Sequence, residues 1–436
     1  MDYDYALAFA LANKALCFFA GAGVSKHLTA NAMPDWQTLL EEAASSLKVA
    51  SQVKDQLDQA RATEFPLEDC AQILELAFLR ERLDFRRAIA DLIGRRQADP
   101  VASTGMKNFL EEHPGVDVMT TNYDDVIESL LPGKCNSNYP GKPVSRRDNC
   151  VDVFHVHGCV LNPSAMVVTT NDYYRFINDG GYFSQKISTM LHENSTVIMG
   201  YSLSDPNLKA ILNGYRSSGG RAINRGNLFY VTRGVVPPHI RDYYETAYGI
   251  AVIENTEIDS LLAGIQSKFA EAQKQAEDAE KNLQSVLYSN HNWTDQYLKL
   301  RDSLFHIIAT ANTNGHNVHS AEFARMLAGI LSRKVEFTKE DSAWEQYSHL
   351  ADWGVYLGSI MDMPHTPLEA SFLSAAEHSM RTMSKSYTIG CSWAAFKTWS
   401  SKWSSLTFQN RLLVRKLVEE KGLGADALEV VSQGDA

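Results

Sequence analysis

The sequence predicts an α/β fold in its first 268 residues, followed by an all-α C-terminal domain. The first part is expected to form a Rossmann-like, mostly parallel sheet with helices on both faces. Short apolar runs alternate there with helical segments, which is typical of parallel strands joined by crossover helices. After about residue 268 the strand-like alternation nearly disappears, and helical periodicity continues to Val431.

The elements of the first part follow from local patterns. Residues 2–14 are expected to form a helix, and the apolar run at 15–20 indicates a short buried strand. A long helical region is predicted over 37–96, within a helical insertion at about 37–110. Residues 151–156 alternate polar and apolar side chains, which favours a strand with one more polar face. The complete set of predicted strands is 15–20, 116–121, 151–156, 196–200, 227–232 and 250–253, with 166–170 as a further candidate.

The change from alternating strands and helices to helices alone suggests where the domain boundaries lie. We expect an α/β domain over 1–268 and a helical connector over 269–285, where Ala, Glu, Gln and Lys are abundant. An α-helical domain for oligomerisation or partner binding then occupies 286–436. Six of the seven tryptophans lie in this last part. The one-turn spacing of Trp393 with Phe396, and of Trp399 with Trp403, favours core packing.

Composition and charge argue against several classes of protein, including nucleic-acid-binding, membrane-spanning and disulfide-rich secreted proteins. The net charge of −11 gives no general attraction to nucleic acid, and no apolar run is long enough to span a bilayer. The acidic start lacks the basic residues of a secretory signal, so we expect a cytoplasmic location. The six cysteines form no C-x-x-C pair, and this spacing favours neither a four-thiolate zinc site nor a disulfide framework. No metal is therefore expected.

Polar clusters follow four of the predicted strands. Gly21–Ser25 follows the first strand, and such a Gly-x-Gly turn brings backbone N–H groups close to a ligand, as in a phosphate cradle. The other clusters are Thr120–Asp124, His155–Gly158 and Gly200–Asn207. Ligands of open parallel sheets bind beyond the carboxyl ends of the strands. We therefore expect these four clusters to converge on one site.

Each cluster also has a simpler structural interpretation. The glycine turn could be an ordinary tight turn, and His157 could be a loop histidine. Asn122 and Asp124 could cap a helix, as could Asp205, because Asn and Asp are good N-caps. The four clusters together are more specific than any one of them.

Taken together, these segments resemble the sirtuin family. Sirtuins carry Gly-Ala-Gly-x-Ser after the first strand, then Pro-Asp-aromatic, Asn-x-Asp, a catalytic His-Gly and a later Gly-x-Ser. The match is closer still to sirtuin-like domains of bacterial antiphage defence proteins, which favour Thr-Thr-Asn-Tyr-Asp and Gly-x-Ser-x-x-Asp-Pro-Asn. The resemblance covers about the first 265 residues. In this chain the motifs are Gly21–Ser25, Pro34–Trp36, Thr120–Asp124, His157–Gly158 and Gly200–Asn207, in that order.

One departure from the family bears on activity. Protein-deacylating sirtuins carry a four-cysteine zinc module between the His-Gly and the last motifs, and here Cys159 is the only cysteine in that interval. The defence-associated relatives also lack the module, and they hydrolyse NAD⁺. The resemblance therefore implies an NAD⁺ hydrolase that cleaves the nicotinamide–ribose bond to give nicotinamide and ADP-ribose. It implies NAD⁺ depletion in antiphage defence, as in abortive infection.

The resemblance also implies a role for each motif residue. His157 would act as general base, which suits an imidazole whose ordinary pKa of about 6.5 lies near working pH. Asn122 would orient the ribose or the attacking water. His155 competes with His157, which we prefer because a glycine follows it directly. The expected NAD⁺-binding residues are Gly21, Ala22, Gly23 and Ser25 for the phosphates, Asp35 and Asp124 for the nicotinamide end, and Gly200 and Ser202 for the adenosine side.

Other functions remain open at this point. A Rossmann dehydrogenase would need a third glycine near position 26, where this chain has Lys26. An NAD⁺-dependent deacylase and a non-catalytic nucleotide-binding scaffold are the two remaining alternatives. An unrestrained NAD⁺ hydrolase would drain a cofactor that every pathway needs. We therefore expect a homo-oligomer, or a hetero-complex with a sensor or regulatory subunit, that is activated by a partner or a signal.

Overall fold

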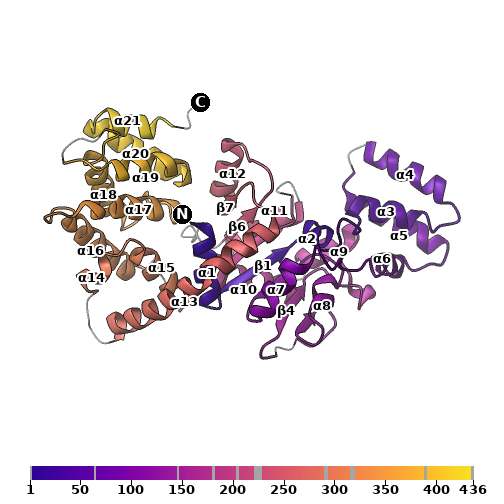
Figure 1. Ribbon diagram of the computed structural model, residues 1–436. Helices are drawn as coiled ribbons and strands as arrows, with labels where there is room; N and C mark the ends of the chain where they lie inside the picture. The colour runs from indigo at the N-terminus through magenta and orange to yellow at the C-terminus, as the bar shows by residue number, and fades with distance from the viewer. Residues whose placement is uncertain are drawn as a thin grey trace.

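A computed structural model of the chain shows an elongated molecule with a central α/β body (Figure 1). Four helices project from one end of the body, and the C-terminal helices pack at the other end. The structure describes residues 2–62, 65–144, 147–178, 182–202, 206–219, 228–288, 293–314, 320–386 and 390–433.

The central sheet has seven strands in the order β3-β4-β2-β1-β5-β6-β7, and every strand pair in the described residues is parallel. The predicted Rossmann-like parallel sheet is therefore confirmed. The chain switches sides at β1, which lies between β2 and β5, and such switch points are where ligands bind. The strands are β1 (Leu16–Ala20), β2 (Asp117–Thr120), β3 (Cys135–Asn138), β4 (Val151–His155), β5 (Ser195–Met199), β6 (Leu228–Val231) and β7 (Ile250–Ile253).

Three details of the strand prediction are wrong. The polar stretch of β3 was not predicted as a strand, because it has no apolar run. The candidate strand at 166–170 does not form: residues 166–169 are irregular and connect a 3₁₀ turn (Pro163–Ala165) to helix α9 (Thr170–Asn178). The expected polar face of β4 is also absent, because all five of its residues are buried. Asn136 of β3 donates a 2.8 Å hydrogen bond to the buried carboxylate of Asp152, so one polar strand satisfies the other.

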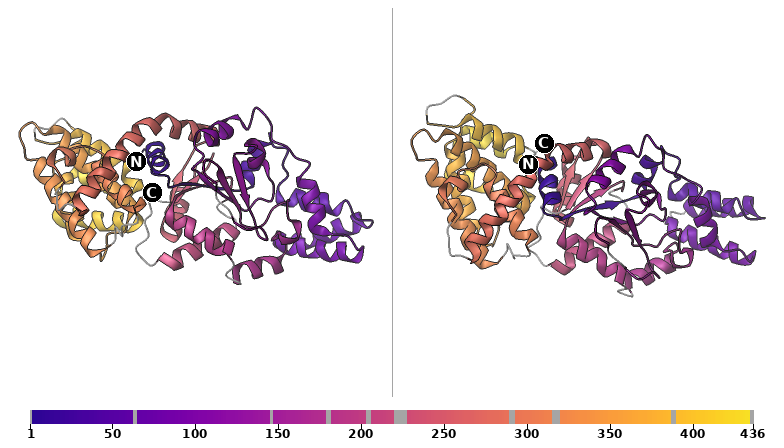
Figure 2. Two further views of the ribbon diagram at one scale, coloured as in Figure 1. Left: turned by 90° about the horizontal axis from the view of Figure 1, so that it is seen from below. Right: turned by 60° about the horizontal axis from the view of Figure 1, so that its bottom comes forward.

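Helices cover both faces of the sheet (Figure 2). Successive side chains of a strand point to opposite faces, and β1 shows this clearly. Phe18 packs in the core formed with helices α1, α7 and α13, whereas Phe19 packs in the core formed with α10 and α11. The helices of the α/β body are α1 (Tyr3–Ala12), α2 (Ala22–Leu28), α7 (Thr104–Glu112), α8 (Val126–Leu130), α10 (Tyr182–Glu193), α11 (Pro206–Gly219), α12 (Pro238–Tyr248) and α13 (Ile258–Tyr288).

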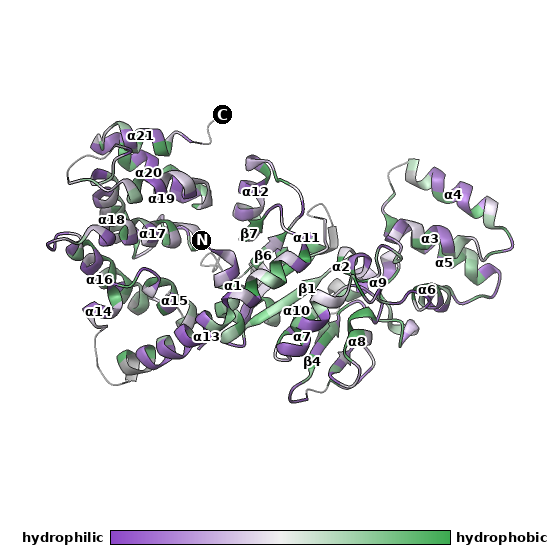
Figure 3. Ribbon diagram, in the orientation of Figure 1, coloured by the Kyte–Doolittle hydropathy of each residue, from purple (hydrophilic) through white to green (hydrophobic). Residues whose placement is uncertain are grey.

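The predicted helical region after β1 is a bundle of four helices that projects from the body (Figure 1). Two of its helices begin at aspartate N-caps: Asp35 accepts a hydrogen bond from the N–H of Thr38, and Asp84 from the N–H of Arg87. Apolar residues on one side of each helix form the interior of the bundle (Figure 3). The four helices are α3 (Trp36–Ala44), α4 (Ala50–Ala62), α5 (Leu67–Arg80) and α6 (Phe85–Ile93).

The C-terminal helices pack around a core of their own, so the all-α prediction is confirmed for the described residues, where one isolated bridge joins Met383 and Ser392. Trp399 and Trp403 are buried in this core as predicted, but Trp393 is 41% exposed. The helices are α14 (Asp295–Leu298), α15 (Ser303–Thr313), α16 (Ala321–Phe337), α17 (Trp344–Ile360), α18 (Glu369–Arg381), α19 (Trp393–Lys402), α20 (Phe408–Lys421) and α21 (Ala425–Val431), with a 3₁₀ turn at Trp403–Ser405.

Helix α13 joins the two cores as one continuous helix. Ile265 and Ala279 belong to the core on the sheet, whereas Leu283 belongs to the C-terminal core. The hydroxyl of Tyr5 also lies 2.8 Å from Nε2 of His306 across the junction. The division into domains at 268 and 286 stays a prediction, which limited proteolysis of the segment 270–289 can test.

A buried lysine in the C-terminal core is expected to make the free energy of unfolding depend on pH. Lys334 is fully buried, donates to the carbonyl of Leu298 at 2.8 Å and lies over the ring of Trp353. Burial lowers the pKa of Lys334 to about 7, below its ordinary value. Between pH 7 and 10 the unfolded chain therefore binds this proton more tightly than the folded chain. The free energy of unfolding should rise with pH in that window.

Replacement of Lys334 by methionine is expected to raise the free energy of unfolding at pH 7 by about 1–3 kcal/mol, since an apolar side chain of similar length needs no buried charge. The alkaline gain in stability should disappear. Denaturant unfolding followed by tryptophan fluorescence can measure both effects. Lys339→Met, at an exposed ion pair with Glu336, is the control and should change stability little. A Lys334→Met variant that is less stable at every pH would contradict the expectation.

Candidate active site

The carboxyl ends of the central strands border a cavity of about 240 Å³. Predicted site residues from all four motifs line it, and residues of the projecting helices close one side. The expected convergence of the motifs is therefore observed. The predicted residues that line the cavity are Ala22, Ser25, Asn122, Asp124, His157, Gly200 and Ser202.

The glycine turn after β1 packs closely against the turn after β5 and is hydrogen-bonded to it. The N–H of Gly21 donates to the carbonyl of Met199 at 2.9 Å, and the N–H of Gly23 donates to the carbonyl of Gly200 at 2.8 Å. A Cβ on Gly23 would lie 2.7 Å from the Cα of Gly200. These two N–H groups are thus engaged within the protein and are not directed at a ligand. Ala22, the first residue of α2, lines the cavity, and its N–H is one of the helix N-terminal donors that have no intrahelical partner.

This packing predicts a strong effect at Gly200. Its φ is +73°, and a Cβ there would lie 2.5 Å from the backbone nitrogen of Val24. Gly200→Ala is therefore expected to lower the free energy of unfolding by about 1–3 kcal/mol and to displace the glycine turn. Thermal unfolding can measure the loss. Gly214→Ala, at an exposed position of helix α11 with open space around it, is the control and should raise stability by about 0.5–1 kcal/mol. Equal stabilities of the two variants would show that the turns can separate freely.

Asn122 ties the turn after β2 to the turn after β1. Its side-chain Nδ2 donates to the carbonyl of Gly21 at 2.9 Å and to the hydroxyl of Ser25 at 2.8 Å. Its backbone N–H donates to the hydroxyl of Thr120. The side chain of Asn122 therefore has one fixed orientation at the cavity wall, which is what a residue that positions a reactant requires.

Asp124 supplies a buried carboxylate to the same wall. It is 8% exposed and accepts a 2.7 Å hydrogen bond from the hydroxyl of Ser25. Burial raises the pKa of Asp124, whereas the hydrogen bond from Ser25 opposes that rise. Asn122, Ser25 and Asp124 form one hydrogen-bonded chain that joins two motifs nearly a hundred positions apart in the sequence.

His157 lies at the cavity with an apolar surround. Its ring makes edge-to-face contacts with Tyr173 and Phe176 of α9, at centroid distances of 5.2 and 5.0 Å. It is 3% exposed, and burial lowers the pKa of His157 to about 4. The imidazole is therefore neutral at physiological pH and can accept a proton, but it is a weaker base than the ordinary imidazole assumed from the sequence.

His155, the competing histidine, is not among the residues that line the cavity. Its Nε2 lies 2.6 Å from a carboxylate oxygen of Glu128, and its Nδ1 lies 3.0 Å from the backbone carbonyl oxygen of Asn122. Burial lowers the pKa of His155, but the carboxylate of Glu128 and its hydrogen bond outweigh burial, so the pKa lies above its ordinary value. His155 and His157 thus have opposite protonation preferences and face different surroundings.

Comparison with known proteins adds to this geometry. Residues 116–253 match the family model of the SIR2-like domain. This part of the chain is therefore similar to a SIR2-like domain. The match begins just before β2, and the structure adds β1 and its glycine turn to the same sheet. The expected resemblance to sirtuin-like domains is confirmed.

Three similar proteins all carry the name NAD(+) hydrolase ThsA. The relative from Cytobacillus dafuensis is 25% identical over 205 residues, which is 45% of this chain and 37% of the relative. Those from Enterococcus faecium and Bacillus cereus (strain MSX-D12) are 22% and 26% identical over 204 and 207 residues. These alignments cover 45% and 46% of this chain, and 39% and 40% of the relatives. The aligned part thus spans well under two thirds of each relative.

Some predicted site residues are placed differently from the expectation. Asp35 does not line the cavity; it caps α3, and the hydrogen bonds from Thr38 lower its pKa to about 2. Its neighbours Pro34 and Trp36 line the cavity instead. Asp205, interpreted as a possible helix cap, lies outside the described residues. The binding roles assigned to Gly21, Gly23 and Asp35 thus stay predictions without a direct cavity contact.

Other residues of the site were not singled out from the sequence. Tyr201 lines the cavity, and its hydroxyl lies 2.7 Å from the hydroxyl of Thr121. Tyr201 follows β5 and Thr121 follows β2, so this contact joins the turns on either side of β1. Tyr173 and Glu68 line the cavity from α9 and α5. Tyr201 directly follows a predicted motif glycine, and that position was the available signal for it.

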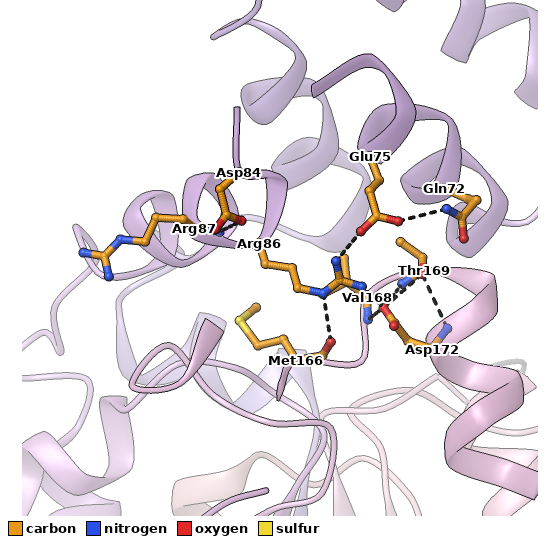
Figure 4. A network of polar contacts seen from close by, with 9 residues as sticks. All are labelled: Gln72, Glu75, Asp84, Arg86, Arg87, Met166, Val168, Thr169 and Asp172. Carbon is orange, nitrogen blue, oxygen red and sulfur yellow. Dashed lines mark hydrogen bonds and ion pairs between the residues drawn. The ribbon is translucent and has the colours of Figure 1, made fainter. Parts of the chain in front are cut away.

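An arginine of the projecting helices contacts the segment around Met166 and Asp172 (Figure 4). Arg86 of α6 binds Glu75 of α5 and forms a 2.5 Å ion pair with Asp172 of α9. Its Nε also donates to the carbonyl of Met166 at 3.4 Å. The next residue, Val167, donates its N–H to the carbonyl of His157. The projecting helices and the His157 loop are therefore held in one polar network.

No group of three or more His, Cys, Asp or Glu side chains in the described ranges is placed to hold a metal ion. Within the same ranges, none of the helices combines the length and the apolar character needed to cross a membrane.

Proposed function

We propose that this chain hydrolyses NAD⁺ at the nicotinamide–ribose bond, releasing nicotinamide and ADP-ribose. The observation that carries the proposal is that Asn122, Asp124 and His157 line a single cavity at the switch point of the sheet. The names of the similar proteins support the same substrate. A cavity of about 240 Å³ suits one end of a dinucleotide rather than the whole molecule.

The chemistry of the three side chains fits this bond. As the C1′–N bond breaks, its electron pair moves to the positively charged pyridinium nitrogen, and the ribose gains oxocarbenium character. The buried carboxylate of Asp124 favours a cationic group nearby, and it can also accept from the nicotinamide amide. Asn122 orients the ribose or the attacking water. The water oxygen bonds to C1′, and its proton passes to neutral His157, directly or through a ribose hydroxyl.

The phosphates are assigned to the turn after β1 and the adenosine to the turn after β5. Ala22 and Ser25 line the cavity on the β1 side, and the Ser25 hydroxyl would have to release Asp124 before it could donate to a phosphate. Gly200 and Ser202 lie on the opposite side of β1. Gly21 and Gly23 contribute by allowing the close approach of the two turns. Asp35 would act from the rim through the loop that carries Pro34 and Trp36.

The direct test incubates the purified chain with NAD⁺ and measures free nicotinamide and ADP-ribose by chromatography. We expect both products in equal amounts, with no need for metal and no change on adding a chelator. An acyl-lysine peptide in a parallel reaction tests the deacylase alternative, which would yield acylated ADP-ribose. NAD⁺ binding without either product, both in vitro and after activation in cells, would favour the non-catalytic scaffold.

We further propose that the activity is gated and serves antiphage defence in the cytoplasm. The C-terminal helices have no catalytic task in this scheme, and helical faces commonly mediate association. A homo-oligomer, or a complex with a sensor subunit, would restrict access to the cavity until a signal arrives. Expression of the chain alone should be tolerated, and co-expression with its activating signal should lower cellular NAD⁺ and stop growth. A monomer that hydrolyses NAD⁺ at full speed without any signal would contradict gating.

A further inference from the structure

A second buried histidine stands directly behind the wall that carries Asn122. His155 is the last residue of β4 and is 1% exposed, and its partner Glu128 on α8 is 15% exposed at the side chain. The ring contacts a carboxylate oxygen on one side and the peptide carbonyl of Asn122 on the other, at 2.6 and 3.0 Å. The proposed mechanism above uses neither His155 nor Glu128.

Geometry alone assigns the protons of this ring. A carbonyl oxygen can only accept a hydrogen bond, so Nδ1 of His155 must carry a hydrogen and donate it to the Asn122 carbonyl. The remaining proton lies between Nε2 and the Glu128 carboxylate. His155 therefore uses both ring nitrogens at once, as ligand-orienting histidines in other sites do.

Strand pairing does not hold the carbonyl of Asn122. Strand β2 ends at Thr120, so no ladder hydrogen bond holds Asn122. Its N–H is held by the Thr120 hydroxyl and its carbonyl by His155, while its side chain reaches Gly21 and Ser25. Loss of the His155 contact would release the carbonyl end of a residue whose side chain lines the cavity.

We propose that Glu128 and His155 form a positioning pair that fixes the Asn122 peptide, and that NAD⁺ cleavage by the proposed mechanism depends on the hydrogen bond from His155 to the Asn122 carbonyl. The inference rests on the proposed function for its kinetic readout alone. Both residues are positioning residues, because neither lines the cavity.

The pair has a defined response to alkaline pH. When it loses its shared proton, the single remaining imidazole proton stays on Nε2, because a hydrogen bond to a carboxylate is stronger than one to a carbonyl. The lone pair of Nδ1 then faces the Asn122 carbonyl and repels it. The other titratable groups that interact with the pair are Asp124 after β2, the Cys135 thiol on β3 and the Cys159 thiol, and burial raises the pKa of both thiols.

Two substitutions of His155 can test its contact with the Asn122 carbonyl separately from its contact with Glu128. His155→Asn carries an amide N–H close to the position of Nδ1 and can keep the bond to the Asn122 carbonyl, whereas His155→Gln reaches Glu128 and loses that bond. We expect kcat to fall about tenfold or more in His155→Gln and about threefold or less in His155→Asn, with the KM for NAD⁺ little changed in both. Equal losses of kcat that follow the melting temperatures would mean a purely structural role and would overturn the proposal.

The pH profile of Glu128→Gln gives a second test if the His155 variants do not fold. The glutamine amide can donate to Nε2, which keeps the ring proton on Nδ1 at every pH. Wild type should lose kcat as His155 deprotonates at alkaline pH, and this loss should vanish in Glu128→Gln. An alkaline loss that persists unchanged in Glu128→Gln would count against the pair.

Hydrogen exchange distinguishes this inference from the proposed function. Deuterium uptake in peptides covering 119–126 should rise in His155→Gln and stay near wild type in His155→Asn, whether or not NAD⁺ is cleaved. If wild-type protein releases no nicotinamide but this pattern appears, the proposed function fails and the positioning pair stands. If uptake is the same in both variants, the positioning pair fails.

Discussion

Replacement of His157 by alanine is expected to reduce nicotinamide release about 100-fold or more, the range typical of a lost general base. The ring lies at the cavity between Tyr173 and Phe176, and no other imidazole of the described residues lines that cavity. The KM for NAD⁺ should change less than kcat, because the proposed role of His157 is to accept a proton rather than to bind the dinucleotide.

His306→Ala is a matched control for this variant. His306 is also buried, and burial also lowers its pKa to about 4. Its ring stacks on Phe9, and neither residue lines the cavity. It should lose stability through the Tyr5 contact but keep kcat per folded molecule. A well-folded His157→Ala variant that releases nicotinamide at the wild-type rate would rule out the assigned mechanism.

The same buried histidine sets an expected pH dependence. The pKa of His157 is about 4 in the folded chain, against an ordinary value of 6.5 in the unfolded chain. Activity at the acid side should therefore persist to about pH 5 and fall as the ring gains a proton near pH 4. The unfolded chain binds the proton first, so the stability that His157 contributes is present above pH 6.5 and is lost as pH falls toward 4. His157→Ala should show a smaller acid loss of stability.

The sequence predicts the strands that are apolar and the turns that follow them. β1, β2, β5, β6 and β7 were all anticipated, because buried parallel strands are short apolar runs. β3 could not be anticipated, since its polar residues gain their partners only when Asn136 meets Asp152 of β4. A pattern within one segment carries no information about such a partner.

The site shows the same limit. Asn122, Asp124 and His157 line one cavity, as expected from their positions after parallel strands, because the carboxyl ends of such strands meet at one edge of the sheet. The role of His155 depends on Glu128, which is 27 positions earlier in the chain, and on a backbone carbonyl. Sequence spacing identified His155 as a competitor for the catalytic role, but it could not indicate which way the ring points.

Asn122→Asp is expected to lower kcat about as much as loss of His157, although asparagine and aspartate side chains have almost the same shape. Nδ2 of Asn122 donates to the Gly21 carbonyl and to the Ser25 hydroxyl, and the Ser25 hydrogen is already given to Asp124. A carboxylate has no hydrogen to donate and would face two acceptors. We expect kcat to fall about 10²–10³-fold, as for a lost preorganised donor.

Asn136→Asp makes the same chemical change at another buried amide. Asn136 donates to Asp152 at 2.8 Å on the outer strand β3, so the substitution should lower the free energy of unfolding by about 1–3 kcal/mol. It should leave kcat per folded molecule near wild type, because Asn136 does not line the cavity. The comparison separates damage to a buried hydrogen bond in general from damage to the cavity wall.

The introduced carboxyl at position 122 also makes a prediction about pH that alanine does not. When protonated, it regains one donor and can bond the Gly21 carbonyl again, so the Asn122→Asp variant should recover part of its kcat as pH falls toward 5. The recovery should end near pH 4, where His157 gains a proton. Nicotinamide release measured from pH 4 to 8 for Asn122→Asp and Asn122→Ala provides the test. If both variants have the same flat profile, the amide of Asn122 does not act through the two hydrogen bonds that it donates.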